Sequence, residues 1–347
     1  MKTPVLVGAR KIEFQDKSRP RIQSGEVLVK VEYCGICGSD VHAYVNGLLY
    51  PLGTVMGHEF SGTVAEIGDE VQAVRLGDRV AVKPSAVCLN CFWCKRGQYS
   101  LCPKRPETII GIRLENDGAF AEYVKIRYPN QMLFKLPSNV ASEQAALAEP
   151  LSISFHSLRR SQFKAEDSVL IVGAGMIGLG ILQFVKLKGA GKTIVLEVSE
   201  KKSLIAQRLG ADVVLNPNSE GAGLRDHIVS LMDGRGPDIV FECAGVTVAF
   251  QTSIDCVRSG GQIMLVSVYE QDVPFSAYKL LHKEVELKGV LSSYDEFKDV
   301  LELLDQGKIN TEVMISDIIP ANDLIVSGFE RLAATNDMVK ILTRRQG

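Results

Sequence analysis

The chain has 347 residues, of which 46% are hydrophobic and 23% are charged, and its formal net charge is -2. This length suits about two domains, each large enough to bury a core of its own. The balanced charge gives no electrostatic reason to expect nucleic acid or an anionic membrane as a partner. No apolar run reaches the roughly 18 residues of a membrane helix, and no signal-type segment follows Met1, so we expect a cytoplasmic protein.

Short β segments separated by glycines fill the first 140 residues or so. Runs rich in valine and isoleucine lie at 27–31, 62–67 and 79–82. Glycines in turn-like contexts, such as Gly57 and Gly77, separate these runs. This pattern is typical of an irregular β domain.

Four of the eight cysteines lie within fifteen residues, at Cys88, Cys91, Cys94 and Cys102. In a long chain without a signal sequence, this density favours metal binding over disulfides. Four thiolates complete the tetrahedral shell of a zinc ion and leave no position for a substrate, so we predict a structural zinc lobe at 85–105. An iron–sulfur cluster is the alternative, but seven residues precede the last cysteine where a ferredoxin run has three. The balanced charge disfavours a nucleic-acid-binding zinc module.

Apolar strands alternate with helical stretches between about 165 and 290. The expected strands are 168–172, 193–196, 213–215, 239–241 and 263–266. A helical stretch at 176–188 follows the first of them. This alternation predicts an α/β fold with a doubly wound parallel sheet. An amphipathic helix at 297–304 and mixed strands come next, and periodicity alone does not place them.

The segment from Gly173 to Gly178 reads Gly-Ala-Gly-Met-Ile-Gly, follows a strand and opens a helix. In a dinucleotide-binding turn, Gly173 permits the tight bend, Gly175 lets the backbone approach the pyrophosphate, and Gly178 lets helix and strand pack closely. Met176 and Ile177 begin the helix, whose free N–H groups would bind phosphate. The alternative is a purely structural turn.

Glu197 ends the next strand, where its carboxylate would accept hydrogen bonds from the adenosine ribose and repel a 2′-phosphate. NAD is therefore favoured over NADP as the cofactor. Lys201 and Lys202 follow closely, and their positive charge weakens this preference. We include Lys202 among the expected cofactor-binding residues.

A second candidate metal group is spread along the chain, at Cys37, His58 and Glu149. A thiolate, an imidazole and a carboxylate supply three ligands and leave the fourth position that a catalytic zinc needs. Such a zinc lowers the pKa of a bound water or alcohol toward neutrality. We expect Asp40 to accept the second imidazole N–H of His58 and so fix its tautomer. Each ligand also has an ordinary alternative, as a buried cysteine, a core histidine or a helix-end carboxylate.

Taken together, these segments resemble the zinc-dependent medium-chain alcohol dehydrogenases over essentially the whole chain. The resemblance rests on Cys37–Asp40, Gly57–Gly62, the four-cysteine lobe, Ala148–Pro150 and Gly173–Gly178. Glu149 followed by Pro150 resembles the sorbitol and butanediol dehydrogenase branch, which has this glutamate in place of the second cysteine of the liver and yeast enzymes. Residues 266–268 and 287–290 also resemble butanediol dehydrogenase, and we expect Val266 and Val268 to contact the cofactor.

The resemblance implies three parts of the chain with different roles. A GroES-like irregular β catalytic domain would occupy 1–149, a Rossmann cofactor domain 150–290, and the segment 291–347 would return to the catalytic domain. The fold class is therefore α/β, with an irregular β domain joined to a doubly wound parallel sheet.

The resemblance also implies site roles. Cys37, His58 and Glu149 would ligate the catalytic zinc, and Glu59 adjoins the metal. It stays open whether Glu59 or Glu149 ligates directly, with the other reaching zinc through water. The Ser39 hydroxyl would lie beside the bound alcohol and His42 in the proton relay toward solvent, and the ordinary alternatives for these two are a turn serine and a surface histidine.

The implied reaction is hydride transfer between a secondary alcohol and NAD, giving a ketone. We expect a homodimer or homotetramer whose subunits each hold a catalytic and a structural zinc. Leu291–Tyr294 lacks the arginine that sorbitol dehydrogenases have at this point, so diols, sugar alcohols and their phosphates all stay open as substrates. The alternatives are a threonine-type amino-alcohol dehydrogenase and an NAD- and zinc-binding relative without turnover.

Overall fold

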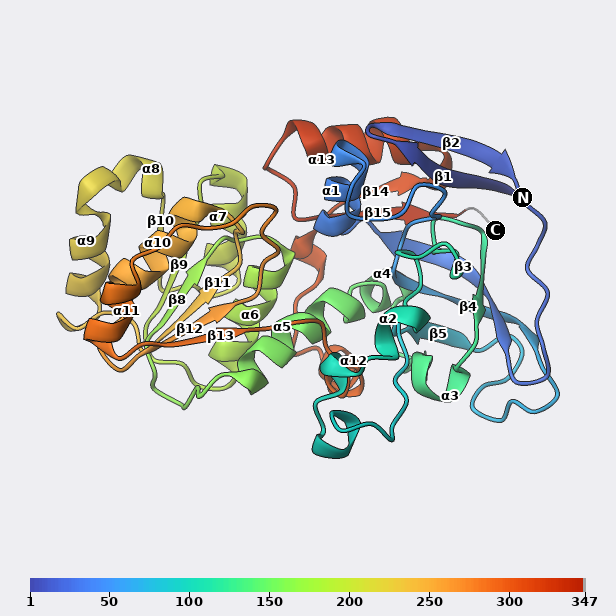
Figure 1. The fold of residues 1–347 in the computed structure, drawn as a ribbon, viewed down its shortest axis with the longest axis horizontal. Helices are drawn as coiled ribbons and strands as arrows, with labels where there is room; N and C mark the ends of the chain where they lie inside the picture. The colour runs from blue at the N-terminus through green and yellow to red at the C-terminus, as the bar shows by residue number, and fades with distance from the viewer. Residues whose placement is uncertain (346–347) are drawn as a thin grey trace. The chain divides into compact units, whose positions relative to one another are not determined.

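The computed structural model describes residues 1–345, and contacts within it divide the chain into two compact units (Figure 1). The first unit comprises Met1–Glu149, Ser293–Asn336 and the residues from Lys340 on. The second comprises Pro150–Ser292 with Asp337–Val339. None of the helices between Met1 and Arg345 combines the length and the apolar character that crossing a bilayer requires.

An irregular, largely antiparallel sheet forms the first unit. Its strand order is β14-β15-β3-β4-β5-β7, with β6 paired to β3 beside this path, and β1 and β2 form a separate pair. The strand bounds are β1 Lys2–Gly8, β2 Lys11–Asp16, β3 Val27–Gly35, β4 Glu59–Ile67, β5 Arg79–Val82, β6 Tyr123–Ile126, β7 Leu133–Lys135, β14 Ile315–Pro320 and β15 Lys340–Arg344. Strand β3 contributes Val27, Val29 and Val31 to the main core, as the two-residue repeat of a strand requires.

The chain's last described strand lies beside the strand that leads into the Cys37 motif. β15 pairs antiparallel with β3, and Thr343 lies opposite Cys34. β14 in turn pairs parallel with β15. Residues separated by about 300 positions therefore share one sheet, and the side chains of β15 can reach the region around Cys37.

Short helices connect the strands of the first unit. They are α1 Gly38–Asn46, α2 Arg105–Thr108, α3 Pro129–Met132, α4 Ser142–Ala145, α12 Glu296–Asp305 and α13 Arg331–Ala334, with 3₁₀ turns at Cys94–Arg96, Tyr99–Leu101, Glu312–Met314 and Ala321–Asp323 and a π-helix at Leu324–Glu330. The predicted amphipathic helix at 297–304 lies within α12.

A six-stranded parallel sheet with the order β10-β9-β8-β11-β12-β13 forms the second unit. Its strands are β8 Val169–Val172, β9 Thr193–Leu196, β10 Val213–Leu215, β11 Ile239–Glu242, β12 Gln262–Leu265 and β13 Glu286–Gly289. Helices alternate with them: α5 Ala148–Arg160, α6 Met176–Leu187, α7 Glu200–Arg208, α8 Pro217–Glu220, α9 Leu224–Leu231, α10 Thr247–Cys256 and α11 Ala277–Lys283, with a 3₁₀ turn at Gly221–Gly223. This strand order reverses at β8, which is the topology of a dinucleotide-binding sheet. The predicted α/β fold class, with an irregular β part and a doubly wound parallel sheet, is confirmed.

Candidate catalytic metal centre and cofactor site

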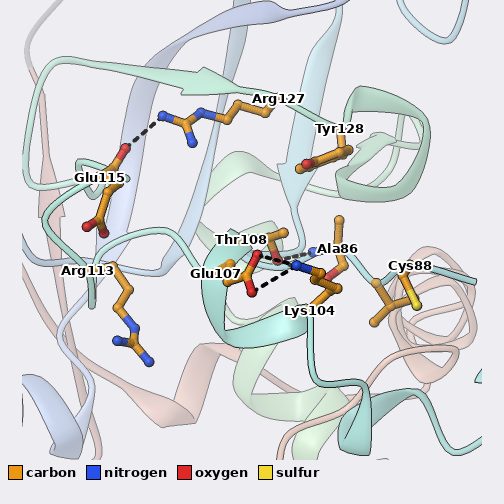
Figure 2. Close-up of a pocket in the computed structure, with 10 residues that line it drawn as sticks. Ala86, Cys88, Lys104, Glu107, Thr108, Arg113, Glu115, Arg127 and Tyr128 are labelled. Atoms are coloured by element: carbon orange, nitrogen blue, oxygen red, sulfur yellow. Dashed lines mark hydrogen bonds and ion pairs between the residues drawn. The ribbon is translucent and has the colours of Figure 1, made fainter. Parts of the chain in front are cut away.

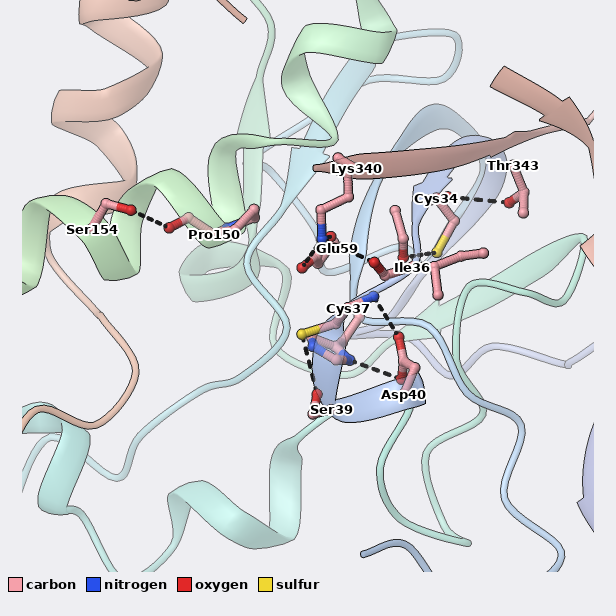
Figure 3. A network of polar contacts seen from close by, with 12 residues as sticks. Cys34, Ile36, Cys37, Ser39, Asp40, Glu59, Pro150, Ser154, Lys340 and Thr343 are labelled. Atoms are coloured by element: carbon pink, nitrogen blue, oxygen red, sulfur yellow. Dashed lines mark hydrogen bonds and ion pairs between the residues drawn. The ribbon is translucent and has the colours of Figure 1, made fainter. Parts of the chain in front are cut away.

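Cys37, His58 and Glu59 bring their ligand atoms within 4.8 Å of one another. The pairing of β3 with β4 explains this proximity, because Gly35 lies directly opposite Glu59 in the antiparallel register. Cys37 follows β3 and is half-buried, whereas His58 and Glu59 are buried at the start of β4. Two neighbouring strand ends thus bring a thiol, an imidazole and a carboxylate close together, and Figure 3 shows Cys37 and Glu59 among them.

Asp40 lies beside both Cys37 and His58. Its fully buried carboxylate accepts a hydrogen bond from the backbone N–H of Cys37 at 3.1 Å, as in a helix capping box. Its other oxygen lies 3.5 Å from Nδ1 of His58. This pairing leaves Nε2 as the histidine nitrogen that can bind a metal.

Glu149 is not part of this group, but the charges of His58 and Glu59 affect its pKa. It is buried at the start of α5, and its Oε2 has no hydrogen-bond partner among residues 1–345. Burial raises the pKa of Glu149 to about 7; positive charge at His58 opposes this shift and the Glu59 carboxylate adds to it. A buried acid of this kind calls for a cation, because a nearby cation favours the ionised carboxylate.

Lys340 is a member of the site that the sequence analysis missed. Its Nζ lies 2.8 and 2.6 Å from the two carboxylate oxygens of Glu59 and 3.0 Å from the carbonyl oxygen of Ile36 (Figure 3). Burial works to lower the pKa of Lys340, but Glu59, Cys37 and Asp40 outweigh it and hold the pKa above its ordinary value. The available signal was a lysine within the apolar run from Val339 to Leu342.

Ser39 and Tyr50 form a hydroxyl chain that ends at Cys37. The Tyr50 hydroxyl donates to Ser39 Oγ at 2.8 Å, and Ser39 Oγ donates to Cys37 Sγ at 3.1 Å. Tyr50 is buried and was not expected at the site. His42 lies on α1 three residues after Ser39, and its side chain is exposed.

These groups fit a catalytic zinc. A thiolate, an imidazole and carboxylates are the ligand types of such sites, and the buried Oε2 of Glu149, which has no hydrogen-bond partner among residues 1–345, is available to a cation. The donor set is therefore suited to one Zn²⁺ with an open position for a substrate oxygen.

The four-cysteine lobe fits a closed zinc site. The sulfurs of Cys88, Cys91, Cys94 and Cys102 all lie within 4.8 Å of one another. The Sγ of Cys88 lies 3.6 Å from that of Cys102 and 3.9 Å from that of Cys94. Zinc–sulfur bonds of 2.3 Å in a tetrahedron place sulfurs about 3.8 Å apart, so the observed spacing is that of a ZnS₄ centre.

A cavity of about 590 Å³ adjoins the lobe but not the Cys37 group. Its lining is mostly charged or polar and includes Cys88 (Figure 2). Lys104 pairs with Glu107 at 3.3 Å, and Arg127 donates to the carbonyl oxygen of Glu115 at 2.9 Å. The cavity is therefore separate from the candidate catalytic centre.

The three glycines of the turn after β8 differ in what their surroundings require. A Cβ at Gly178 would lie 2.0 Å from the carbonyl oxygen of Gly173, and Gly173 itself has a φ of +99°, so the protein needs glycine at both positions. A Cβ at Gly175 would meet nothing within 4 Å. The space beside Gly175, where α6 begins, is what a dinucleotide pyrophosphate needs.

Glu197 lies against this turn. Its buried carboxylate accepts hydrogen bonds from the backbone N–H groups of Ala174 at 2.8 Å and of Val198 and Ser199 at 2.9 Å. Lys202, also buried, places its Nζ 3.4 Å from Glu197. The structure thus brings together the glycine turn, Glu197 and Lys202.

The two expected valines lie at the end of β12. The N–H of Val266 donates to the carbonyl oxygen of Glu242 at 3.0 Å, and Val268 is 58% exposed. The carboxyl ends of parallel strands are where such sheets bind ligands, so both valines lie at the edge expected to hold the cofactor.

The fold and the two metal groups define a zinc-dependent, nicotinamide-linked oxidoreductase. Residues 23–138 match the family model for the alcohol dehydrogenase GroES-like domain, and residues 177–306 match the model for zinc-binding dehydrogenase. The chain is 32% identical over 322 residues to sorbitol dehydrogenase of Bacillus subtilis, covering 91% of this chain and 89% of that one. It is 32% identical over 345 residues to (R,R)-butanediol dehydrogenase of the same organism, covering 96% of each.

Solved structures extend this similarity to cofactor complexes. A putative zinc-binding dehydrogenase from Sinorhizobium meliloti bound to NADP superimposes with a TM-score of 0.87 at 29% identity over 98% of both chains. An alcohol dehydrogenase from E. coli in complex with NADH superimposes with a TM-score of 0.89 at 26% identity over 99% of both. The chain belongs to the zinc-dependent medium-chain alcohol dehydrogenase family, in its sorbitol and butanediol dehydrogenase-like branch. Zinc and a nicotinamide dinucleotide are its cofactors, and its substrate is a small molecule.

Proposed function

We propose that this enzyme oxidises a secondary hydroxyl of a small diol or polyol to a ketone, with NAD accepting the hydride. The convergence of Cys37, His58 and Glu59 beside the Ser39 hydroxyl carries the proposal. The names of the Bacillus subtilis relatives, a sorbitol and a butanediol dehydrogenase, support a polyhydroxylated substrate. They do not favour the amino-alcohol alternative.

Cys37 and His58 would hold the catalytic zinc, and two carboxylates compete to complete its shell. Glu59 is nearer but already paired with Lys340, whereas Glu149 is buried without a partner for Oε2 among the described residues. Cys88, Cys91, Cys94 and Cys102 would hold the structural zinc. When bound, the catalytic ion supplies a Lewis acid that lowers the pKa of the substrate hydroxyl.

Ser39 and His42 would carry the proton that the substrate hydroxyl loses toward solvent. Ser39 would take a place between the substrate oxygen and solvent, with Tyr50 fixing the orientation of its hydroxyl. His42, one turn further along α1 and exposed, would pass the proton outward. Asp40 would keep His58 and the Cys37 backbone in place throughout.

The proposal is tested by nicotinamide absorbance with the zinc-loaded chain, NAD or NADP, and a panel of secondary alcohols. The panel contains vicinal diols, sugar alcohols, sugar-alcohol phosphates and threonine. We expect reduction of NAD with a diol or a sugar alcohol. Reduction with threonine alone, or silence across the panel at full zinc occupancy, would contradict the proposal.

Replacing Tyr50 by phenylalanine removes the donor to Ser39 without removing the ring. Because the Ser39 hydroxyl then stabilises the deprotonated substrate oxygen less well, we expect kcat/KM for alcohol oxidation to fall about fivefold at neutral pH. The apparent pKa of the pH–rate profile should rise for the same reason. Tyr44→Phe is the matched control, since the Tyr44 hydroxyl donates to Glu330 at 2.6 Å, and an equal shift in both variants would contradict the role of Tyr50.

We also propose NAD as the preferred cofactor, on the strength of the Glu197 carboxylate beside the glycine turn. Replacing Glu197 by alanine should weaken NAD binding about tenfold more than NADP binding, because only NAD has a free ribose 2′-hydroxyl to donate. Titration of the chain with each cofactor gives the ratio. Glu200→Ala, an exposed charge removal three residues later, is the control, and an unchanged ratio in the Glu197 variant would refute the ribose contact.

The assembly that we propose is a cytoplasmic homo-oligomer. β13 lies at the edge of the six-stranded sheet, and the adjacent α11 exposes Tyr278 and Leu281 at 68% and 76%. An edge strand and exposed apolar side chains are each suited to contact with another protein surface.

A further inference from the structure

Glu242, the last residue of β11, holds two loops of the second unit on one carboxylate. Its side chain is fully buried. Oε1 accepts the backbone N–H groups of Ala244 at 2.9 Å and Gly245 at 3.0 Å. Oε2 accepts the hydroxyl groups of Ser267 and Tyr269.

These contacts tie two segments together at the carboxyl edge of the sheet. Glu242 lies opposite Val172 of β8 and Leu265 of β12 in the parallel register, so its neighbours on both sides are the strands that lead into the cofactor turns. The turn at 243–245 follows β11, and the segment at 267–269 follows β12. One buried side chain thus joins the segments that follow two adjacent strands.

The turn at 243–245 also contacts the glycine turn directly. A Cβ on Gly173 would lie 3.1 Å from the backbone nitrogen of Ala244 and 3.2 Å from the carbonyl carbon of Cys243. Gly245 has a φ of +71°, and a Cβ there would lie 2.7 Å from the carbonyl oxygen of Val268. The three segments are therefore packed backbone to backbone, and a shift of the middle one would displace the other two.

We propose that Glu242 is a positioning residue for the nicotinamide dinucleotide, an inference that rests on the proposed function. Each of its oxygens already accepts two hydrogen bonds, which fills the acceptor capacity of a carboxylate. Glu242 therefore acts on the cofactor through the segments that it holds and does not contact the cofactor itself. Glu197 holds the glycine turn directly, through the N–H of Ala174, whereas Glu242 holds the segment at 243–245 that packs against Gly173.

The test is the dissociation constant of NADH, measured by fluorescence titration of Glu242→Gln and of a matched control. The amide donates where the carboxylate accepted, so we expect the dissociation constant of NADH to rise about tenfold. The KM of the alcohol and the zinc content should stay at the wild-type values. Asp238→Asn is the control, because Asp238 precedes the same strand at its other end and accepts from Ser168 and Arg258.

A purely structural role predicts a different outcome. If Glu242→Gln and Asp238→Asn lose thermal stability while NADH binds both as it binds the wild type, the inference is overturned. If Glu242→Gln does not fold, Tyr269→Phe decides, since it removes one donor and should still raise the dissociation constant about threefold. A wild-type chain that binds neither NADH nor NADPH would overturn the proposed function and this inference together, a result distinct from an unaffected variant.

Discussion

Replacement of Cys37 by serine is expected to lower turnover by about 1,000-fold or more, because a lost Lewis acid costs several kcal/mol of transition-state stabilisation. A hydroxyl, a poor zinc ligand, replaces the Cys37 sulfur that lies within 4.8 Å of the His58 and Glu59 ligand atoms. The ion at this centre should be lost while the lobe keeps its own. Steady-state kinetics and metal analysis of the purified variant give both quantities.

Cys34→Ser is the matched control for this variant. Cys34 lies three residues earlier, is fully buried, and its thiol donates to the carbonyl oxygen of Gly35 at 3.6 Å. Serine keeps that donor, so zinc content and turnover should stay near the wild-type values. Equal loss of zinc and activity in both variants would show that Cys37 acts through packing and would remove its assignment as a ligand.

Replacement of Lys340 by methionine should destabilise the fold by about 3–5 kcal/mol, the range for removing one partner of a buried ion pair. The substitution leaves Glu59 buried at 1% exposure with no ammonium beside it. The carbonyl oxygen of Ile36 also loses its donor. Urea unfolding of the metal-free chain measures the loss of unfolding free energy without a contribution from bound zinc.

The double variant Lys340→Met with Glu59→Gln separates the charge from the packing. The uncharged amide removes the unpaired buried anion, so most of the lost stability should return. In the zinc-loaded single variant, Glu59 is released toward the metal, and the zinc affinity should rise. The stabilising role of the Lys340–Glu59 ion pair would be contradicted if Lys340→Met were as stable as the wild type. It would also be contradicted if the double variant were no more stable than Lys340→Met.

Much of the fold follows from local sequence patterns. The apolar runs at 168–172, 193–196 and 239–241 predict the strands of the parallel sheet closely, since each is buried on both faces and bounded by turns. The irregular sheet is less predictable. β4 begins at Glu59, three residues before the expected run at 62–67, because pairing with β3 extends it through residues without a strand pattern.

The remaining parts depend on contacts that are distant in the sequence. β15 joins β3 across about 300 residues, and only the family resemblance placed the tail. Lys340 meets Glu59 over a separation of 281 residues, so the apolar run around Lys340 indicates a buried lysine but does not reveal its partner. Tyr50 lies outside the helices and strands, and no local pattern predicts that its hydroxyl reaches Ser39, eleven residues earlier.

The choice between Glu59 and Glu149 as the zinc ligand also depends on contacts between distant parts of the sequence. The spacing in the sequence does not indicate which of Glu59 and Glu149 ligates zinc, since both belong to motifs of the same family. The structure groups Glu59 with Cys37 and His58 but also pairs it with Lys340. Glu149 is buried, and its Oε2 has no hydrogen-bond partner within the described part of the chain. Which of them ligates zinc stays a prediction, and the Lys340 variants bear on it directly.

The most direct test is NAD reduction by metal-free chain that is reloaded stepwise with zinc, using the best alcohol from the panel as substrate. The two groups of ligands, Cys88–Cys102 and the Cys37 centre, predict no turnover without metal and full turnover only when both sites are filled. Full activity of the metal-free chain, or saturation of the chain by a single zinc ion, would contradict a zinc-dependent dehydrogenase with separate structural and catalytic ions.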